Sequence, residues 1–228
     1  MLTLWVALKK EVVKMRHSYS SWSTYKQCPA KFKFSYIDKL PRGAVHPNAK
    51  RGTDVHKSVE DFINGSQPML HPEINSEYGH WIMNLKNNSE CLPEPMWLIN
   101  SDWELIDNED MAWAKGFFDL QAVYKDKIEI YEWKTGKIYD EHIEQRFLYG
   151  LIALLKFPKY NTITVTNVYF DQKKKVAQEF KRENVNFMKD TWTKRFKKIE
   201  SEKQFPPNPQ FLCRYCSFSK QNGGPCQF

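Results

Sequence analysis

Apolar residues recur every three or four positions in three segments of the chain, which predicts three amphipathic helices. The segments run from Arg51 to Asn64, from Asp140 to Phe157, and over residues 184–200. Their expected buried positions include Val55, Phe62, Ile143, Leu151, Phe187 and Trp192. A shorter helix is expected around Tyr78 to Leu85, and aromatic residues with helical spacing flank Cys28-Pro29. Gly65 and Pro158 are suitable stop signals for the first two helices.

Strands are predicted between these helices, where β-branched and aromatic residues alternate with polar ones. The expected strands cover residues 96–106, 111–124, 127–133 and 163–170. Outside the short helix, residues 66–95 are rich in proline, asparagine and serine and are expected to be irregular. The run Lys173-Lys174-Lys175 is expected to form a solvated turn.

The central hairpin carries the most informative pattern in the chain. The segment GFFDLQAVYKDKIEIYEWKTG places Asp119 within an apolar strand and Glu132 and Lys134 at the end of the next strand. Side chains alternate across a strand, so Glu132 and Lys134 share a face with apolar Ile128 and Ile130. Burying such charges is costly unless a partner or a metal compensates.

The length of the turn decides whether Asp119 joins that face. With a Lys125-Asp126 turn, Asp119 lies opposite Glu132; with an Asp126-Lys127 turn, it lies opposite Lys134. A three-residue turn would send Asp119 to the other face. Two carboxylates and a lysine at strand ends could hold a hard cation, whereas an ordinary surface hairpin with a cross-strand salt bridge is the competing interpretation.

Two of the predicted helices carry polar residues beside their apolar faces. His56 and Glu60 are four residues apart and therefore lie one above the other on the first helix. Gln145 and Tyr149 have the same spacing on the second helix. A single histidine beside an apolar stripe is usually a structural residue, so His56 becomes a candidate ligand only through its neighbours.

Composition narrows the class of partner. The chain has 228 residues, a formal net charge of +7 and 15% aromatic residues. This balance is compatible with a nucleic-acid partner, although many solvated proteins are equally basic. No apolar run reaches the roughly 18 residues that a membrane-spanning helix needs, so we expect an intracellular protein without a membrane partner. Residues 1–14 are an expected extension before Met15, which could itself be the start, and residues 15–228 are expected to form one domain.

Five cysteines are distributed unevenly, which argues against a secreted disulfide scaffold. Cys213 and Cys216 form a Cys-x-x-Cys motif in the proline-rich tail, and nine residues separate Cys216 from Cys226. A tetrahedral site needs four ligands, for which Cys28 is the natural fourth and Cys91 the spare. Such a site would clip Cys28 to the 205–228 tail; unliganded thiols in a loose tail are the other interpretation.

The order of these motifs resembles the RecB-like branch of the PD-(D/E)XK nuclease superfamily, from His17 to Cys226. The matching segments are SYSSWSTYKQCPAKFKFSYIDKL, RGTDVH with His56, GFFDL with Asp119, YEWKTG with Glu132 and Lys134, and QRFLY with Gln145 and Tyr149. Two positions depart from the usual pattern: Phe118 replaces a proline, and Glu132 replaces an aspartate.

The resemblance implies an α/β (α+β) fold with a restriction-endonuclease-like core. That core is a mixed central sheet flanked by helices, with a helical N-terminal lobe and a cysteine-rich tail. It also implies that His56, Asp119 and Glu132 ligate Mg²⁺ or Mn²⁺ and that Lys134 lies beside the attacking water. Gln145 and Tyr149 would help to orient the site or the DNA.

The cysteine layout is similar to that of AddB-type nucleases and CRISPR-associated RecB-like exonucleases. This resemblance implies a [4Fe–4S] cluster held by Cys28, Cys213, Cys216 and Cys226. The long last gap, with Gly223-Gly224, leaves Zn²⁺ or a vacant site as alternatives, because four thiolates suit either metal centre.

The sequence therefore predicts a metal-dependent DNA nuclease, preferentially an exonuclease acting on single-stranded DNA or on a free end. A non-catalytic nucleic-acid-binding module on the same scaffold and a structure-specific endonuclease are the alternatives. Because the chain contains no helicase motif, a helicase or recombination partner would be a separate protein.

Overall fold

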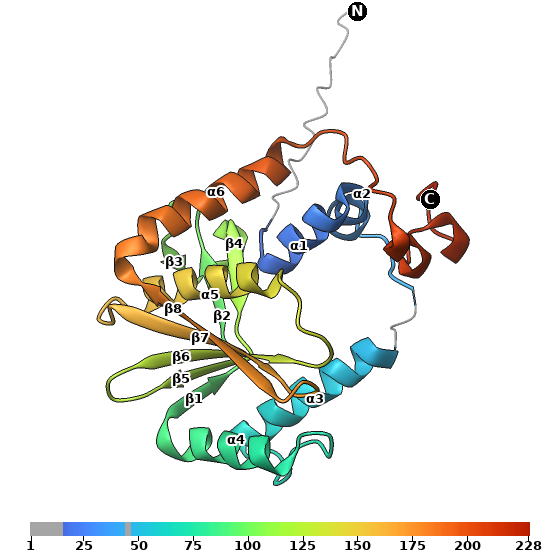
Figure 1. The fold of residues 1–228 in the computed structure, drawn as a ribbon. Coiled ribbons are helices and arrows are strands. Elements are labelled where there is room, and N and C mark those ends of the chain that lie inside the picture. The colour runs from blue at the N-terminus through green and yellow to red at the C-terminus, as the bar shows by residue number, and fades with distance from the viewer. Residues whose placement is uncertain (1–15, 44–46) are drawn as a thin grey trace, which may run out of the picture.

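The computed structural model describes residues 16–43 and 47–228, so the expected extension of residues 1–14 lies outside the described residues. A five-stranded mixed sheet with the order β1-β5-β6-β7-β8 forms the centre of the fold. Helices α3 and α4 cover one face of this sheet, and α5 and α6 lie on the other (Figure 1). This arrangement is the mixed α/β fold with flanking and N-terminal helices that the sequence predicts.

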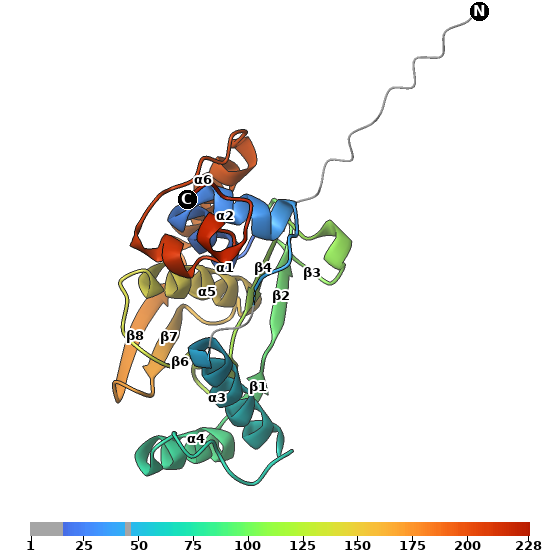
Figure 2. The ribbon, with the colours of Figure 1, turned by 90° about the vertical axis from the view of Figure 1, so that its right-hand side faces the viewer.

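The central sheet contains one parallel pair, between β6 and β7, and its other pairs are antiparallel. Its strands are β1 (Glu90–Pro93), β5 (Leu120–Val123), β6 (Ile128–Lys134), β7 (Thr162–Tyr169) and β8 (Lys174–Lys181). A smaller antiparallel sheet has the order β3-β2-β4 and lies beside the main one (Figure 2). Its strands are β2 (Met96–Ile99), β3 (Leu105–Ile106) and β4 (Ala114–Phe117).

The α-helices lie close to where the sequence predicts them. They are α1 (Tyr19–Gln27), α2 (Pro29–Phe32), α3 (Pro47–Asn64), α4 (Ser76–Asn88), α5 (His142–Lys156) and α6 (Val185–Ser201). Short helical segments are η1 (Lys33–Ile37), η2 (Glu109–Met111), η3 (Arg182–Asn184), η4 (Phe211–Tyr215) and η5 (Lys220–Asn222). None of the helices among the described residues is both long and apolar enough to cross a membrane.

Three expectations about local structure are wrong. The predicted strands 96–106 and 111–124 are each broken. Residues 96–106 turn back on themselves to form the antiparallel pair of β2 and β3, and residues 111–124 pass from the small sheet to the main one between β4 and β5. Residues 90–93, expected to be irregular, form β1. Lys173 lies in the expected turn, but Lys174 and Lys175 already belong to β8, a strand that the sequence pattern does not predict. Strands β1 and β8 are the edge strands of the main sheet, and edge strands carry exposed charges that obscure the hydrophobic alternation.

Strand β6 lies in the middle of the main sheet and separates two hydrophobic cores. Ile128 and Ile130 pack into the core that contains α5 and α6. Tyr131 and Trp133 face the opposite core, which contains α3 and α4. Because both faces of β6 are covered, the charged residue at position 132 is held in a buried place.

Helix α5 lies very close to the sheet. A Cβ atom at Gly150 would come within 2.3 Å of the Phe180 ring on β8, so no larger side chain fits there without displacement. The C-terminal end of α5 is held by Arg182, whose Nη2 donates to the carbonyl oxygens of Leu154 at 2.9 Å and Phe157 at 2.8 Å. A cation at this end also complements the helix dipole.

We predict that Arg182→Ala lowers the free energy of unfolding by about 1.5–3 kcal/mol, because it removes hydrogen bonds donated by a charged group to buried carbonyls. Chemical denaturation monitored by tryptophan fluorescence measures this change. Lys181→Ala, at the exposed neighbouring position, is the control and should have little effect. Equal stability of the Arg182 variant and the wild type would contradict the proposed cap.

His17 fixes the start of the described chain to the body of the protein. Its ring is buried and stacks on Phe196 of α6 with ring centroids 4.6 Å apart. His17 Nε2 forms a hydrogen bond with Glu200 Oε1 at 2.9 Å. Burial lowers the pKa of His17, and this effect exceeds the opposing influence of Glu200. The folded protein therefore disfavours the charged imidazole.

We predict that part of the acid sensitivity of the fold comes from His17. Below the ordinary imidazole pKa of about 6.5, the unfolded chain takes up a proton that the folded state resists, so stability falls with pH. Between pH 7.5 and 5.5, the wild type should lose more unfolding free energy than His17→Phe. Parallel losses in the two proteins would show that His17 does not contribute.

Candidate active site

The hairpin of β5 and β6 has the register that places the two acids opposite each other. Tyr124 N donates to Lys127 O at 2.9 Å, which leaves Lys125 and Asp126 as the two-residue turn. Leu120 pairs with Tyr131, so one further step places Asp119 opposite Glu132. Of the two registers that the sequence leaves open, the structure has the first.

Asp119 lies where the chain passes from the small sheet to the main one. It sits between β4 and β5, and the preceding Phe118 is buried against Tyr149 with ring centroids 5.0 Å apart. Asp119 Oδ2 accepts a hydrogen bond from Trp133 N at 2.6 Å. The break between the sheets therefore fixes the position of this carboxylate beside the end of β6.

His56 approaches the same carboxylate from the other side of the sheet. It is carried by α3, which is held to the sheet by Val55 and Val59, and its Nδ1 lies 3.4 Å from Asp119 Oδ1. Burial lowers the pKa of His56, but the hydrogen bond and charge of Asp119 outweigh this effect, so the pKa is raised. His56 and Asp119 therefore form a mutually stabilising pair.

Glu132 is only 6% exposed, and its two oxygens differ in their surroundings. Oε1 accepts hydrogen bonds from Lys134 Nζ at 2.9 Å and Gln145 Nε2 at 2.6 Å. Oε2 is buried and has no hydrogen-bond partner within residues 16–43 and 47–228. Burial, followed by the charge of Asp119, raises the pKa of Glu132 to about 7.

Lys134 and Gln145 form a network around Glu132. Lys134 Nζ donates to Gln145 Oε1 at 2.8 Å as well as to Glu132. Gln145 Nε2 also donates to Tyr149 Oη at 3.1 Å. Burial is the main cause of the raised pKa of Tyr149, which therefore stays protonated. Gln145 and Tyr149 are both buried. They therefore support Glu132 and Lys134 from the interior of the protein and do not form an open surface.

The structure thus brings together all the residues that the resemblance assigns to the catalytic site. Asp119 and Glu132 both influence the pKa of His56, and Lys134 opposes them, so these four charges share one electrostatic environment. In the described part of the chain, however, no group of three or more His, Cys, Asp or Glu side chains has an arrangement that would hold one metal ion. The residue types and the partnerless Glu132 Oε2 suit a divalent cation, but its coordination geometry is not formed.

Two further residues near this site are absent from the sequence predictions. Glu94 follows β1, and its backbone N–H donates to Asp119 O at 3.2 Å. Burial raises the pKa of Glu94, and Asp119 contributes to the same shift. Tyr19 of α1 donates to Glu141 O at 2.9 Å and responds to the charge of Glu132. Tyr19 belongs to the SYSSWSTYKQ segment, but that segment gave it no role in the site, and Glu94 belongs to no recognisable motif.

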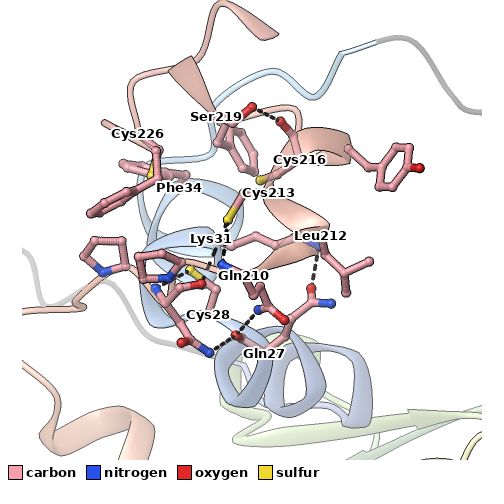
Figure 3. A pocket seen from close by; sticks show the side chains of 16 residues that line it. Gln27, Cys28, Lys31, Phe34, Gln210, Leu212, Cys213, Cys216, Ser219 and Cys226 are labelled. Atoms are coloured by element: carbon pink, nitrogen blue, oxygen red, sulfur yellow. Dashed lines mark hydrogen bonds between the residues drawn. The ribbon is translucent and has the colours of Figure 1, made fainter. Parts of the chain in front are cut away.

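The four predicted cluster ligands lie around one cavity between α2 and the C-terminal tail. Cys28, Cys213, Cys216 and Cys226 line this space of about 160 Å³ (Figure 3). All four are free thiols, as is Cys91, which is not among the lining residues. Asn208 N donates to Cys28 Sγ at 3.4 Å and Gln210 N to Cys213 Sγ at 3.3 Å. Among the described residues, the four sulfur atoms do not form a group that could hold a metal ion.

The tail is attached to the N-terminal helices independently of the thiols. The side-chain amides of Asn208 and Gln210 both donate to Gln27 O, each at 2.9 Å. Both ribbon views place the tail next to α2 (Figures 1 and 2). The C-terminal end of α1 and the tail are therefore joined beside the place where the sequence predicts a clip.

The chain is similar to a number of solved structures, of which two are described here. A structure described as "Putative exonuclease" from Eubacterium rectale is 11% identical, with a TM-score of 0.51, and the match covers 95% of this chain and 92% of that one. The crystal structure of SSO0001 is 16% identical with a TM-score of 0.45, and the match covers 98% and 91% of the two chains. At these identities the first likeness concerns the fold alone. A comparison with curated proteins gave no match.

The sequence itself matches a family profile over residues 16–221, almost the whole described chain. This range includes His56, Asp119, Glu132, Lys134, Gln145 and Tyr149. The site built on the β5–β6 hairpin therefore lies within the matched region, and the chain belongs to the PD-(D/E)XK nuclease superfamily.

Proposed function

We propose that this protein is a metal-dependent deoxyribonuclease that hydrolyses phosphodiester bonds and acts as an exonuclease. The observation that carries the proposal is the buried Glu132, whose Oε2 has no hydrogen-bond partner among the described residues although three charged residues surround it. A buried carboxylate oxygen without a donor is costly unless a cation completes its environment. Superfamily membership supplies the nucleic-acid substrate.

His56, Asp119 and Glu132 are the residues that would hold Mg²⁺ or Mn²⁺. A divalent cation bound there would supply Lewis acidity to the phosphodiester and lower the pKa of a bound water. The chain itself fixes the two ligating carboxylates. Trp133 N and His56 orient Asp119, while Gln145 and Lys134 hold Glu132 Oε1. Glu132 Oε2 is thereby directed away from these donors.

Lys134 is the residue in the best position to assist the reaction. Its ammonium group has three N–H donors, and two of them are used by Glu132 and Gln145. The third can bind the attacking water or a phosphate oxygen. A fixed positive charge at that point would stabilise the negative charge that develops in the transition state.

The proposed substrate is single-stranded DNA or DNA with a free end. The net charge of +7 suits a polyanion. A separate helicase or recombination partner would supply unwound DNA. End-labelled linear DNA and circular DNA, each single- and double-stranded and incubated with Mg²⁺ or Mn²⁺ and with EDTA, distinguish an exonuclease from an endonuclease. Binding to DNA without cleavage under every metal condition would instead support the non-catalytic module.

We predict that Lys134→Ala binds DNA like the wild type but cleaves it about 10²–10³-fold more slowly, because one group that stabilises the transition state is lost. Initial rates on a fluorescent oligonucleotide, with affinity measured in EDTA, test this. Lys137→Ala, an exposed lysine three residues away, is the matched control. Cleavage by Lys134→Ala at the wild-type rate would remove this residue from the mechanism.

We also propose that Cys28, Cys213, Cys216 and Cys226 hold a [4Fe–4S] cluster that joins the tail to the N-terminal helices, with Zn²⁺ as the alternative. The supporting observations are the shared cavity and the backbone N–H groups directed at two of the sulfurs. The cluster's role would be structural: it would fix two segments that are far apart in the sequence.

Anaerobically purified wild-type protein is predicted to be brown and to contain about four iron atoms per chain. Cys213→Ser should lose the colour and the iron, whereas Cys91→Ser, which alters the thiol outside the cavity, should keep both. Iron and zinc analysis together with visible absorption provide the measurement. A colourless protein with one Zn²⁺ per chain would replace the cluster by zinc, and no metal in the wild type would refute both.

A further inference from the structure

A second, more polar cavity lies directly beside the cysteine-lined one. It has a volume of about 340 Å³ and shares Lys31, Tyr215, Cys216 and Phe218 with its neighbour. One wall comes from α1, α2 and η1, and the other comes from the tail around Ser217. The tail is therefore needed to complete this cavity.

The cavity is lined by hydroxyl groups and cations, and no aspartate or glutamate is among its lining residues. Its polar side chains include Ser20, Thr24, Lys31, Ser35, Arg42 and Ser217. Within the described ranges, the hydroxyls of Ser20, Ser35 and Ser217 have no hydrogen-bond partner. These groups are hydrogen-bond donors that a ligand could use.

Neither cation of the cavity is neutralised by a carboxylate in the described part of the chain. Lys31 Nζ donates to the neutral Gln27 Oε1 at 2.7 Å, and Arg42 makes no ion pair there. By contrast, Lys26 at the end of α1 pairs with Glu144 at 2.9 Å. The cavity is thus locally positive and lacks its own counter-charge.

The local backbone is also unusual. Residues Lys33–Ile37 form a π-helical turn, in which Asp38 N donates to Lys33 O at 2.9 Å. This wider turn carries Ser35 and Tyr36, both of which line the cavity. Single π-helical turns occur often at functional sites, where they change the direction of side chains.

We propose that this cavity binds a phosphate group of the DNA strand, away from the phosphate that is cleaved; the inference rests on the proposed nuclease function. A lysine, an arginine and several free hydroxyls without a carboxylate form a donor set that suits phosphate oxygens. Helix α1 links this cavity to the catalytic site, because the Tyr19 hydroxyl donates to Glu141 O just before α5. Because the tail forms one wall of this cavity, a metal centre that holds the tail against the N-terminal helices would also support substrate binding.

The test compares two double variants that remove the same charge. Lys31→Gln/Arg42→Gln changes the cavity, and Lys203→Gln/Lys220→Gln changes two exposed lysines that do not line it. Affinity for a fluorescent single-stranded oligonucleotide is measured in EDTA over a range of salt concentrations, and kcat and KM are measured with Mg²⁺ or Mn²⁺. Oligonucleotides with a 5′-phosphate and a 5′-hydroxyl distinguish a terminal phosphate from an internal one.

The cavity variant should bind about tenfold more weakly, with the slope of log K against log salt reduced by about 0.7 for one lost phosphate contact on a single strand. It should raise KM and leave kcat unchanged, whereas the control variant should change neither. Equal losses in both variants, or no loss in the cavity variant, would overturn this site while leaving the nuclease function intact. Absence of cleavage by the wild type would instead refute the nuclease function, and the EDTA binding data would still decide whether the cavity takes phosphate.

Discussion

The structure depends on a carboxylate that is buried at the end of the central strand. Both faces of β6 are covered by hydrophobic cores, so Glu132 has little access to water. The protein compensates for this with donors to one oxygen, from Lys134 and Gln145, and provides none in the described residues for the other. That asymmetry distinguishes the site from an ordinary buried ion pair, in which both oxygens would be satisfied.

The elements around β6 hold the residues that contact or neighbour Glu132 in place. Helix α5 supplies Gln145 and Tyr149, and its close approach to β8 at Gly150 and its C-terminal cap at Arg182 fix its position. Helix α3 supplies His56 from the opposite face, and the break between the two sheets supplies Asp119. Residues from these three separate parts of the chain thereby meet at the carboxyl end of β6.

The sequence predicts the placement of residues on the β5–β6 hairpin because the signals there are local. A two-residue turn and strand alternation are enough to bring Asp119 opposite Glu132 in one of two registers, and only the hydrogen bond of Tyr124 to Lys127 selects between them. Glu94 could not be predicted, because it reaches Asp119 through the pairing of β1 with β5, which no local pattern encodes. Helical periodicity also places Ile143 and Phe187 in the core, yet they are 50% and 67% exposed, since each lies near the first turn of its helix.

We propose that His56, Asp119 and Glu132 form one divalent-cation site. Titration of Mn²⁺ into the protein, followed by electron paramagnetic resonance, tests this claim most directly, without DNA or turnover. We expect the wild type to bind Mn²⁺ and Glu132→Gln, which keeps the size of the side chain but removes its charge, to bind it at least tenfold more weakly. Equal Mn²⁺ affinity in the two proteins would contradict it.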